Sequence, residues 1–460
     1  MKRKSARQSS STTEIHAVAA LTHTGEARER IVSVLDIGSS KTCCLVAAVD
    51  GDAVDAARPG APLDARVIGS AELRSAGIKA GSVVDLARAE DVVRRVIAKA
   101  EASAGREIEQ IAIAVSCGRL ASANFTVSAD VVGERVSAAD VDRLFEAGRN
   151  FAASDGRTLL HLNALGFGID ESDGVADPRD MLADRLTADL HAVTADVSPL
   201  RNLTALIDRA YLDVSRLVAT PFASATAAIT DEEARLGCLC IDLGAGTTTM
   251  AMFAEGHFIH ADAIALGAHQ ITLDIARRLG APIEEAERLK TLHASLVTAQ
   301  SDEREMVSYP VVDADEVGLY EVSRRELQEI VRPRIAELLD LVSDRLTRSG
   351  MRDFASDQVV LTGGGAALTG LRDFAESRLD MHIRIASPRT IDGLAEDETT
   401  PAHTAALGLL RLTAPRPGAD PVRTLDANAM AQTSIFAQMG RWLRQSLWDD
   451  DRDDARRTGT

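Results

Sequence analysis

Two short polar segments of the sequence share one design. Asp36-Ile-Gly-Ser-Ser-Lys41 follows the apolar run 31–35, and Asp242-Leu-Gly-Ala-Gly-Thr-Thr-Thr249 follows the apolar run that begins at Leu236. In each case a predicted strand ends in an aspartate, glycines and hydroxyl-bearing residues, and a second apolar run comes next. A design that occurs near the N-terminus and again past the midpoint predicts two related halves that face each other.

Both turns suit the binding of a phosphate and a divalent cation. The backbone N–H groups of a glycine turn form a cradle for anions, and glycine lets the backbone approach a ligand closely. Lys41 adds a positive charge for a phosphate. Asp36 and Asp242 are candidates for holding Mg²⁺ through water, because this ion keeps several of its waters. Hydroxyl donors are available from Ser39, Ser40, Thr247, Thr248 and Thr249.

Two more segments extend this pattern. Gly363-Gly364-Gly365 ends an apolar strand, and a triple glycine leaves room for a flat ligand against the backbone. A tight turn from strand to helix is the alternative. Glu287 and Lys290 stand three residues apart and share one face of a predicted helix. Taken alone, that pair is more simply explained as a surface ion pair.

An α/β framework positions these segments. Apolar runs predict strands at 31–35, 43–49, 65–73, 111–115, 250–253, 258–263 and 359–362. Helical spacing predicts helices at 89–104, 268–279, 284–296, 323–349, 368–378 and 402–412. Pro333 is expected to kink the longest helix or to begin a new one.

Residues 116–200 differ from the rest of the chain in their pattern of predicted strands and helices. Short alternating strands surround one helix, 138–149, which begins after Ser137. This pattern predicts a small inserted α+β module, with a polar loop at 166–178. His161, His191 and His257 lie in strand-like runs, where half-buried packing residues are expected.

Composition limits the possible functions. The chain has 460 residues, 45% of them hydrophobic, so it can bury a large core. Its net charge of −18 argues against a broad nucleic-acid-binding face. The five cysteines form no CxxC pair, which predicts neither a zinc site nor a disulfide framework. No run of 18 apolar residues occurs, and no HExxH or GxSxG motif indicates zinc hydrolysis or acyl transfer.

The C-terminal segment has the pattern of an amphipathic helix. Between residues 434 and 448, apolar side chains fall within an arc of roughly 140°, and such a helix is only about 22 Å long. This profile is typical of a helix that lies in a membrane interface, and docking on a protein groove is the alternative. The candidate membrane-binding residues are Ile435, Phe436, Met439, Arg441, Trp442, Leu443, Arg444 and Leu447.

The aspartates that follow this helix oppose strong membrane binding. Asp449, Asp450 and Asp451 are repelled by an anionic surface, whereas the two helix arginines contribute only about 2 kcal/mol of attraction. A single helix is therefore expected to bind weakly. Weak anchors gain strength when many are joined, so membrane attachment is predicted to depend on self-assembly.

In combination, the four segments resemble the actin-like ATPase superfamily, in the order phosphate loop one, phosphate loop two and adenosine loop. Within it, the chain resembles the FtsA family of bacterial cell division proteins. That likeness is carried by the strings at 35–42, 77–85, 219–225, 241–248 and 361–365, and it extends to the inserted module at 115–116 and 191–194.

This resemblance implies an α/β actin-like ATPase fold with two RNase H-like halves. The halves would be 29–115 with 201–235, and 236–412 with a helical subdomain at about 280–350. The inserted SHS2-like interaction subdomain would be 116–200. The remaining parts would be a disordered leader at 1–28, a linker at 413–432, the amphipathic helix at 433–448 and a charged tail at 449–460.

The resemblance also implies ATP and Mg²⁺ as ligands. Nucleotide contacts would come from Asp36, Gly38, Ser39, Ser40, Lys41, Asp242, Gly244, Ala245, Gly246, Thr247, Thr248, Glu287, Lys290, Gly363, Gly364 and Gly365. Hydrolysis would be slow at most, with Asp242 the only candidate for orienting water. The implied role is a filament-forming adaptor on the cytoplasmic face of the inner membrane at the division site. It would anchor FtsZ and recruit later division proteins through residues 116–200.

Other members of the superfamily provide the alternatives. A small-molecule kinase would need an acidic base for its substrate hydroxyl and would not need a membrane helix. A pilus-assembly ATPase is a nearer relative, but the C-terminal helix is not expected there. A chaperone-type ATPase would need a large peptide-binding domain, and too little sequence follows residue 412 for one.

Overall fold

The computed structural model describes residues 30–50, 59–61, 63–117, 119–153, 156–313, 316–354 and 356–414. The predicted leader, amphipathic helix and charged tail lie outside these residues, as does the predicted linker from residue 415 onward. The candidate membrane-binding residues at 435–447 therefore lie outside them too.

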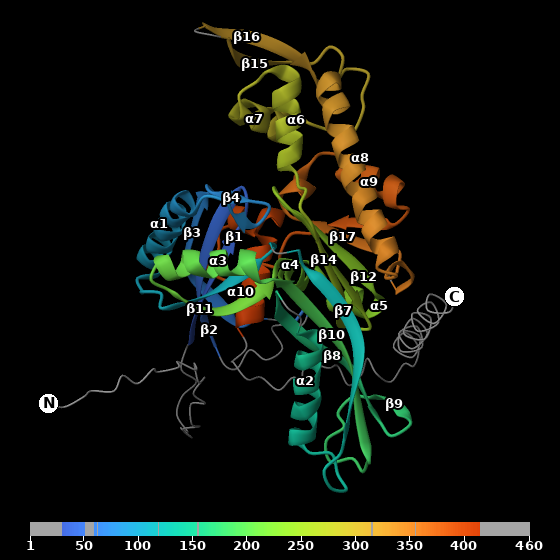
Figure 1. Cartoon of the computed structure of the whole chain (residues 1–460). Coiled ribbons are helices and arrows are strands. Elements are labelled where there is room, and N and C mark those ends of the chain that lie inside the picture. The colour runs from blue at the N-terminus through green and yellow to red at the C-terminus, as the bar shows by residue number, and fades with distance from the viewer. Residues whose placement is uncertain are drawn as a thin grey trace, which may run out of the picture.

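Two five-stranded sheets with the same topology form the centre of the fold (Figure 1). The first sheet has the order β11 (Asp213–Ala219), β6 (Gln110–Val115), β1 (Arg30–Ile37), β2 (Lys41–Val49) and β3 (Ala65–Arg74). The second has the order β18 (His382–Ile385), β17 (Gln358–Thr362), β12 (Cys238–Leu243), β13 (Thr248–Ala254) and β14 (His257–Ile264).

Strand directions match between the two sheets. The central strand β1 pairs with β2 antiparallel and with β6 parallel, and β12 pairs in the same way with β13 and β17. The prediction of two related halves is confirmed at the level of topology. Asp36 and Asp242 therefore occupy equivalent places, each near the end of its central strand.

Helices cover both sheets and fill the space between them. Residues of α1 (Leu86–Ala104) and α3 (Val197–Arg209) pack into one apolar core with the first sheet. The opposite face of that sheet packs on α10 (Thr404–Thr413), which lies against α4 (Thr220–Ala228) between the halves. The second sheet packs on α6 (His269–Leu279), α7 (Ile283–His293), α8 (Arg324–Arg348) and α9 (Leu371–Leu379), with α5 (Asp231–Leu236) leading into it.

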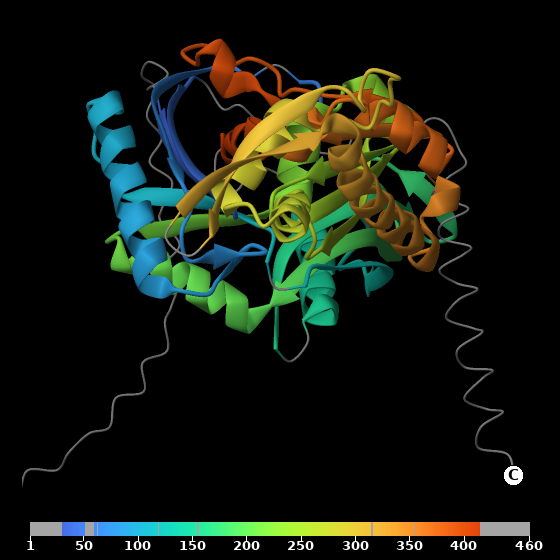
Figure 2. The same cartoon turned by 90° about the horizontal axis from the view of Figure 1, so that it is seen from above.

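Local sequence accounts for the ends of these helices. The Asp85 side chain accepts the N–H of Arg88 at 3.1 Å to begin α1, and Gly105 ends it in the left-handed conformation at φ 64°. The long helix α8 continues through Pro333, so this proline neither ends the helix nor begins another. Pro333 is exposed. Figure 2 shows α1 on one side of the molecule and α8 on the other.

The inserted module forms a sheet of its own at one end of the molecule (Figure 1). Its strands are β7 (Ala121–Asp130), β10 (Arg185–Asp196), β8 (Arg157–Ile169) and β9 (Ser172–Val175), in that order, and α2 (Ala138–Ala152) packs on it. The predicted loop at 166–178 is wrong in part, because residues 166–169 complete β8 and 172–175 form β9. Glycines at 166, 168 and 174 suggested a loop, but cross-strand pairing overrides that tendency.

Two β-hairpins were not predicted. Strands β15 (Met306–Asp313) and β16 (Glu316–Ser323) form a ribbon within the region expected to be helical, and it lies at the end opposite the insert (Figure 1). A smaller hairpin, β4 (Ile78–Lys79) and β5 (Ser82–Val83), lies between β3 and α1 in the chain.

The three histidines are more deeply buried than predicted. His161, His191 and His257 have exposures of 8%, 0% and 6%. Two of them join the insert to the body, because His161 contacts the ring of Phe222 edge-on at 5.1 Å and His191 contacts that of Phe258 at 4.8 Å. The two phenylalanine rings stack at 4.4 Å. Burial lowers the pKa of His161 to about 3, so this junction is packed around a neutral imidazole.

All five cysteines are buried and free. Among the helices in the described ranges, none combines the length and the apolar character needed to cross a membrane.

Gly408 allows α10 to approach α4 closely, so a side chain at this position is expected to lower the stability of the fold. A Cβ at Gly408 would lie 1.7 Å from the carbonyl oxygen of Ala223, a backbone atom that cannot rotate away. We expect Gly408→Ala to lower the free energy of unfolding by about 1–3 kcal/mol through overpacking, measured by denaturant titration. The matched helical control is Gly148→Ala, because the atom it approaches is only the mobile Cδ1 of Leu190. Equal stabilities for the two variants would contradict the prediction.

Candidate functional site

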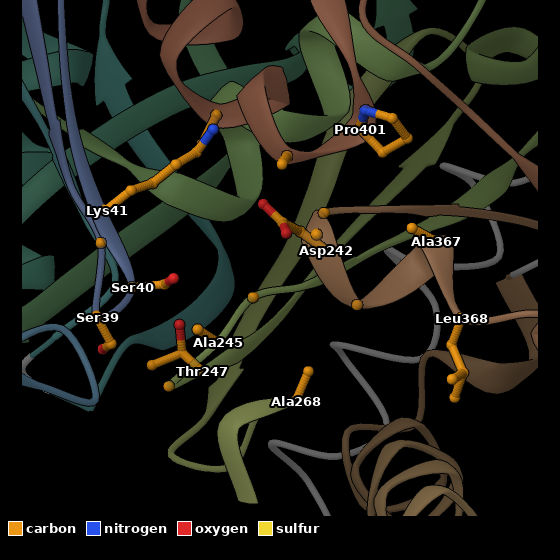
Figure 3. A pocket seen from close by; sticks show the side chains of 18 of the residues that line it. Ser39, Ser40, Lys41, Asp242, Ala245, Thr247, Ala268, Ala367, Leu368 and Pro401 are labelled. Atoms are coloured by element: carbon orange, nitrogen blue, oxygen red, sulfur yellow. The ribbon is translucent and has the colours of Figure 1, made fainter. Parts of the chain in front are cut away.

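A cavity of about 260 Å³ lies between the two halves (Figure 3). Fifteen of the sixteen predicted nucleotide-contact residues line it: Asp36, Gly38, Ser39, Ser40, Lys41, Asp242, Gly244, Ala245, Gly246, Thr247, Glu287, Lys290, Gly363, Gly364 and Gly365. Thr248 is the exception. It is buried at the start of β13, and its hydroxyl donates to the carbonyl of Leu266 at 2.8 Å. The next residue, Thr249, lines the cavity instead.

The two polar turns have the same local construction. In the first turn the N–H of Gly38 donates to the carbonyl of Lys41 at 3.0 Å, and a Cβ at Gly38 would lie 2.9 Å from that oxygen. In the second turn a Cβ at Gly244 would lie 2.8 Å from the carbonyl of Thr247. Both turns are too tight for a side chain at these positions, which leaves their backbones open toward the cavity.

Asp242 is buried and Asp36 is partly buried, and their carboxyl groups repel each other. Burial, and after it the charge of Asp242, raises the pKa of Asp36 to about 6, although Lys41 acts to lower it. Burial also raises the pKa of Asp242, and the hydroxyl of Ser224, which donates to its Oδ2, lowers it. Such a pair favours a cation between the groups.

The residues present fit Mg²⁺ that arrives with a phosphate. In the described ranges no group of three or more His, Cys, Asp or Glu side chains could hold a metal ion. Mg²⁺ suits this arrangement, because it commonly takes one or two carboxylates and completes its shell with waters and substrate phosphates. The Thr249 hydroxyl is buried beside the cavity without a hydrogen-bond partner, which leaves one more polar group for a ligand.

Lys41 lines the cavity but its amine is engaged elsewhere. Its Nζ donates to Oε2 of Glu72 at 2.7 Å and lies 2.7 Å from Nε2 of His403. Its side chain points away from Ser39 and Ser40 in Figure 3. The hydrogen bond with His403 is the largest cause that lowers the pKa of Glu72, to about 2. A role of Lys41 toward a phosphate therefore requires this cluster to open.

The opposite wall of the cavity is suited to a nucleoside. Lys290 Nζ donates to Glu287 Oε2 at 2.8 Å and to Thr272 Oγ1 at 3.0 Å, so this pair is tied to α6 rather than free on the surface. Ile271 and Leu368 provide apolar surface near Gly363–Gly365. A Cβ at Gly363 would lie 2.2 Å from Oδ1 of Asp242, so glycine is required there.

Several lining residues escaped sequence reasoning. Ser116, Thr220, Pro401 and Ala402 come from segments far apart in the chain: the loop after β6, the first residue of α4 and the 3-10 helix Pro401–His403. Ser116 and Thr220 directly follow β6 and β11, so both lie where strands parallel to β1 end. Both also lie in strings that carry the family resemblance, 115–116 and 219–225, so their position after a strand and that resemblance are the signals that point to them.

Comparisons with known proteins agree with this geometry. The profile described as "Cell division protein FtsA" matches residues 239–408, and that of the "SHS2 domain inserted in FTSA" matches 117–194. The cell division protein FtsA of Rhizobium meliloti is 39% identical over 427 residues, which cover 91% of this chain and 96% of the relative. The chain belongs to the FtsA family of bacterial cell division proteins. FtsA of Escherichia coli is 27% identical over 423 residues, 90% of this chain and 96% of that one.

A solved structure gives the same answer for the fold. The "PilM-PilN type IV pilus biogenesis complex" contains a chain with a TM-score of 0.58 and 16% identity, covering 85% of this chain and all of that one. At this identity the likeness concerns the fold alone. It confirms the actin-like ATPase fold predicted for this FtsA-family chain.

The pair of carboxyl groups predicts an unusual pH dependence. Because the folded pKa of Asp36, about 6, lies above its ordinary value of 3.8, ionising Asp36 destabilises the metal-free fold. The contribution of Asp36 to stability is therefore full below about pH 4, declines as pH rises from 4 to 6 and is constant above that. We expect the melting temperature of Asp36→Asn in EDTA, relative to the wild type, to rise by several degrees between pH 4 and pH 7.5, by calorimetry, with most of the rise below pH 6. Parallel melting curves at all pH values would contradict this.

Proposed function

We propose that this FtsA-family protein binds ATP with Mg²⁺ in the cavity between its halves. The observation that carries the proposal is the pair of facing Asp-Gly turns, which bring the carboxyl groups of Asp36 and Asp242 into one cavity. The turns would hold the phosphates through backbone N–H groups, Asp36 and Asp242 would hold Mg²⁺ through water, and Gly363–Gly365 would face the adenosine. Glu287 and Lys290 would lie on the nucleoside side.

The cavity favours binding over rapid turnover. Its carboxylates, within the described residues, are Asp36, Asp242 and Glu287, and the last is occupied by Lys290 and Thr272. No further carboxylate is left to act as a general base for water or for a substrate hydroxyl. Hydrolysis would be slow at most, and a small-molecule kinase is disfavoured for the same reason.

The ligand would act by shifting a conformational equilibrium. Mg²⁺·ATP contacts both halves at once, so it favours the closed arrangement over an open one. We propose that the closed state is the one that polymerises. Exposed apolar side chains at opposite ends of the molecule support a head-to-tail arrangement: Met306, Leu319 and Tyr320 on the β15–β16 ribbon, and Val132, Met181 and Leu182 on the insert.

The proposed role is an adaptor between the FtsZ ring and the inner membrane. FtsZ would bind the helical subdomain, where a cavity of about 550 Å³ lies between α6 and α8 and carries Arg277, Arg278 and Ile330. Later division proteins would bind the insert at 116–200. The segment 433–448, outside the described residues, would lie in the cytoplasmic face of the membrane at the division site.

Nucleotide binding is tested by removing one carboxylate. We expect Asp242→Asn to weaken Mg²⁺-dependent ATP binding at least about tenfold, because a lost charge–metal interaction exceeds 1.4 kcal/mol. Isothermal titration calorimetry with Mg²⁺ or EDTA measures this. The matched control is Asp340→Asn, since that carboxylate is exposed and pairs with Arg378 far from the cavity. Unchanged affinity in Asp242→Asn would refute the assignment.

Membrane attachment is tested by sedimentation with anionic vesicles. We expect the full chain to pellet with the vesicles when ATP and Mg²⁺ are present, and a chain truncated after Gln432 to stay in solution. Attachment should rise steeply with protein concentration, because joined weak anchors bind cooperatively. A full chain that stays in solution at every concentration would favour docking of the C-terminal helix on a protein.

A further inference from the structure

The β4–β5 hairpin has no role in the proposed function, although residues 77–85 carried part of the family resemblance. Its turn is held in an unusual backbone conformation, with φ of 46° at Ala80 and 71° at Gly81, and Gly77 precedes it at 74°. A non-glycine residue in the left-handed region is uncommon and costs energy. Ala80 is the one such residue in this hairpin, and its positive φ indicates that surrounding contacts help to fix the shape of the turn.

The hairpin first contacts the two Asp-Gly turns of the cavity, 36–41 and 242–249. The N–H of Gly81 points at Oγ of Ser39 in the first turn, 3.5 Å away. Gly246 of the second turn lies so close that a Cβ there would be 2.2 Å from Ser39 Oγ and 3.1 Å from the backbone nitrogen of Ala80. The turn of the β4–β5 hairpin therefore contacts both Asp-Gly turns of the cavity. The space between Gly246, Ser39 and Ala80 is too small for a methyl group.

The remaining contacts are with the base of the insert. A Cβ at Gly81 would lie 2.4 Å from Oγ of Ser116 and 3.0 Å from the nitrogen of Cys117, where the chain leaves β6 for the insert. Strand β5 packs on α3, which begins at Val197 directly after the last strand of the insert. Both points at which the chain crosses between the first half and the insert thus lie against this hairpin.

An apolar cluster makes these contacts stiff. Ile78 and Val83 of the hairpin pack against a buried core that contains Cys117, Leu200 and Leu203. Packed cores transmit a displacement rather than absorb it, because their side chains have little free volume. A shift of the turn toward the cavity would therefore move the insert's two connections together.

We propose that the β4–β5 hairpin couples the phosphate occupancy of the cavity to the orientation of the insert. This rests on the proposed function, which places phosphates between the two turns. The Ser39 hydroxyl can donate to a phosphate oxygen while its lone pairs accept the N–H of Gly81. Because that contact is long at 3.5 Å, it can shorten when a phosphate orders Ser39. Partner binding by the insert and nucleotide binding would then influence each other reciprocally.

Hydrogen exchange of the full-length protein tests the coupling, with Mg²⁺·ATP as the probe. In the wild type we expect exchange to slow at the two turns, 36–41 and 242–249, and also at 77–85, 116–124 and 197–209. The last two ranges lie outside the cavity walls except at Ser116, so protection there reports transmission to the insert.

Two glycine variants separate the effect of a steric contact with the insert from the effect of backbone strain at positive φ. Gly81→Ala forces a methyl group onto Ser116 and Cys117, whereas Gly105→Ala has the same sign of φ, 64°, and nothing within 4 Å. We expect Gly81→Ala to keep ATP affinity within a few fold but to lose the protection at 116–124 and 197–209. Gly105→Ala should keep both. Val83→Ala, which removes hairpin packing without adding atoms, should reduce the same protection if Gly81→Ala does not fold.

The possible results separate a failure of the proposed coupling from a failure of the proposed ATP binding. Protection at both turns without any change at 116–124 and 197–209 overturns the coupling and leaves ATP binding intact. Retained protection in folded Gly81→Ala and Val83→Ala also overturns it. If Mg²⁺·ATP changes exchange nowhere in the wild type, the proposed function fails and the coupling falls with it.

Discussion

The repulsion between Asp36 and Asp242 is the constraint on which the rest of this structure depends. Two strands that occupy equivalent places in two sheets end in carboxyl groups inside one cavity, and burial makes it costly for both to be ionised. The proposed divalent cation with phosphates would remove this cost. Because the charged groups belong to different halves, a ligand that neutralised them would also favour an arrangement in which the halves lie closer together.

Closure of this kind needs a stable interface between the halves that still lets them move relative to each other. Helices α4 and α10 provide it, since Gly408 lets one backbone approach the other. Polar contacts also join the halves elsewhere: Glu233 pairs with Arg384 at 2.7 Å, and Oε2 of Glu72 lies 2.9 Å from Nε2 of His403. Ser70 donates to Glu398 at 2.6 Å and Arg74 pairs with Glu284 at 3.0 Å, and both of these involve exposed or partly exposed groups. Such pairs contribute little individually, so they can open without a large loss of stability.

The insert is attached more rigidly than a tethered module would be. Apart from the hairpin contacts at its base, Asn124 of β7 donates to the carbonyl of Ile259 at 3.0 Å, and the rings of His161 and His191 pack on Phe222 and Phe258. The insert therefore touches both halves. Any relative movement of the halves must therefore be accommodated at its base.

The sequence by itself determined the repeated strand–turn–strand units, most of the helices and the glycines and aspartates of the cavity, because these are read from local periodicity and turn chemistry. Tertiary structure decided which of two neighbouring residues lines the cavity. Strand alternation turns Thr249 rather than Thr248 toward the cavity, and the pairing of Lys41 with Glu72 and His403 joins three distant chain segments. The β15–β16 ribbon and the contacts of the 77–85 hairpin likewise depend on packing between segments that no local pattern records.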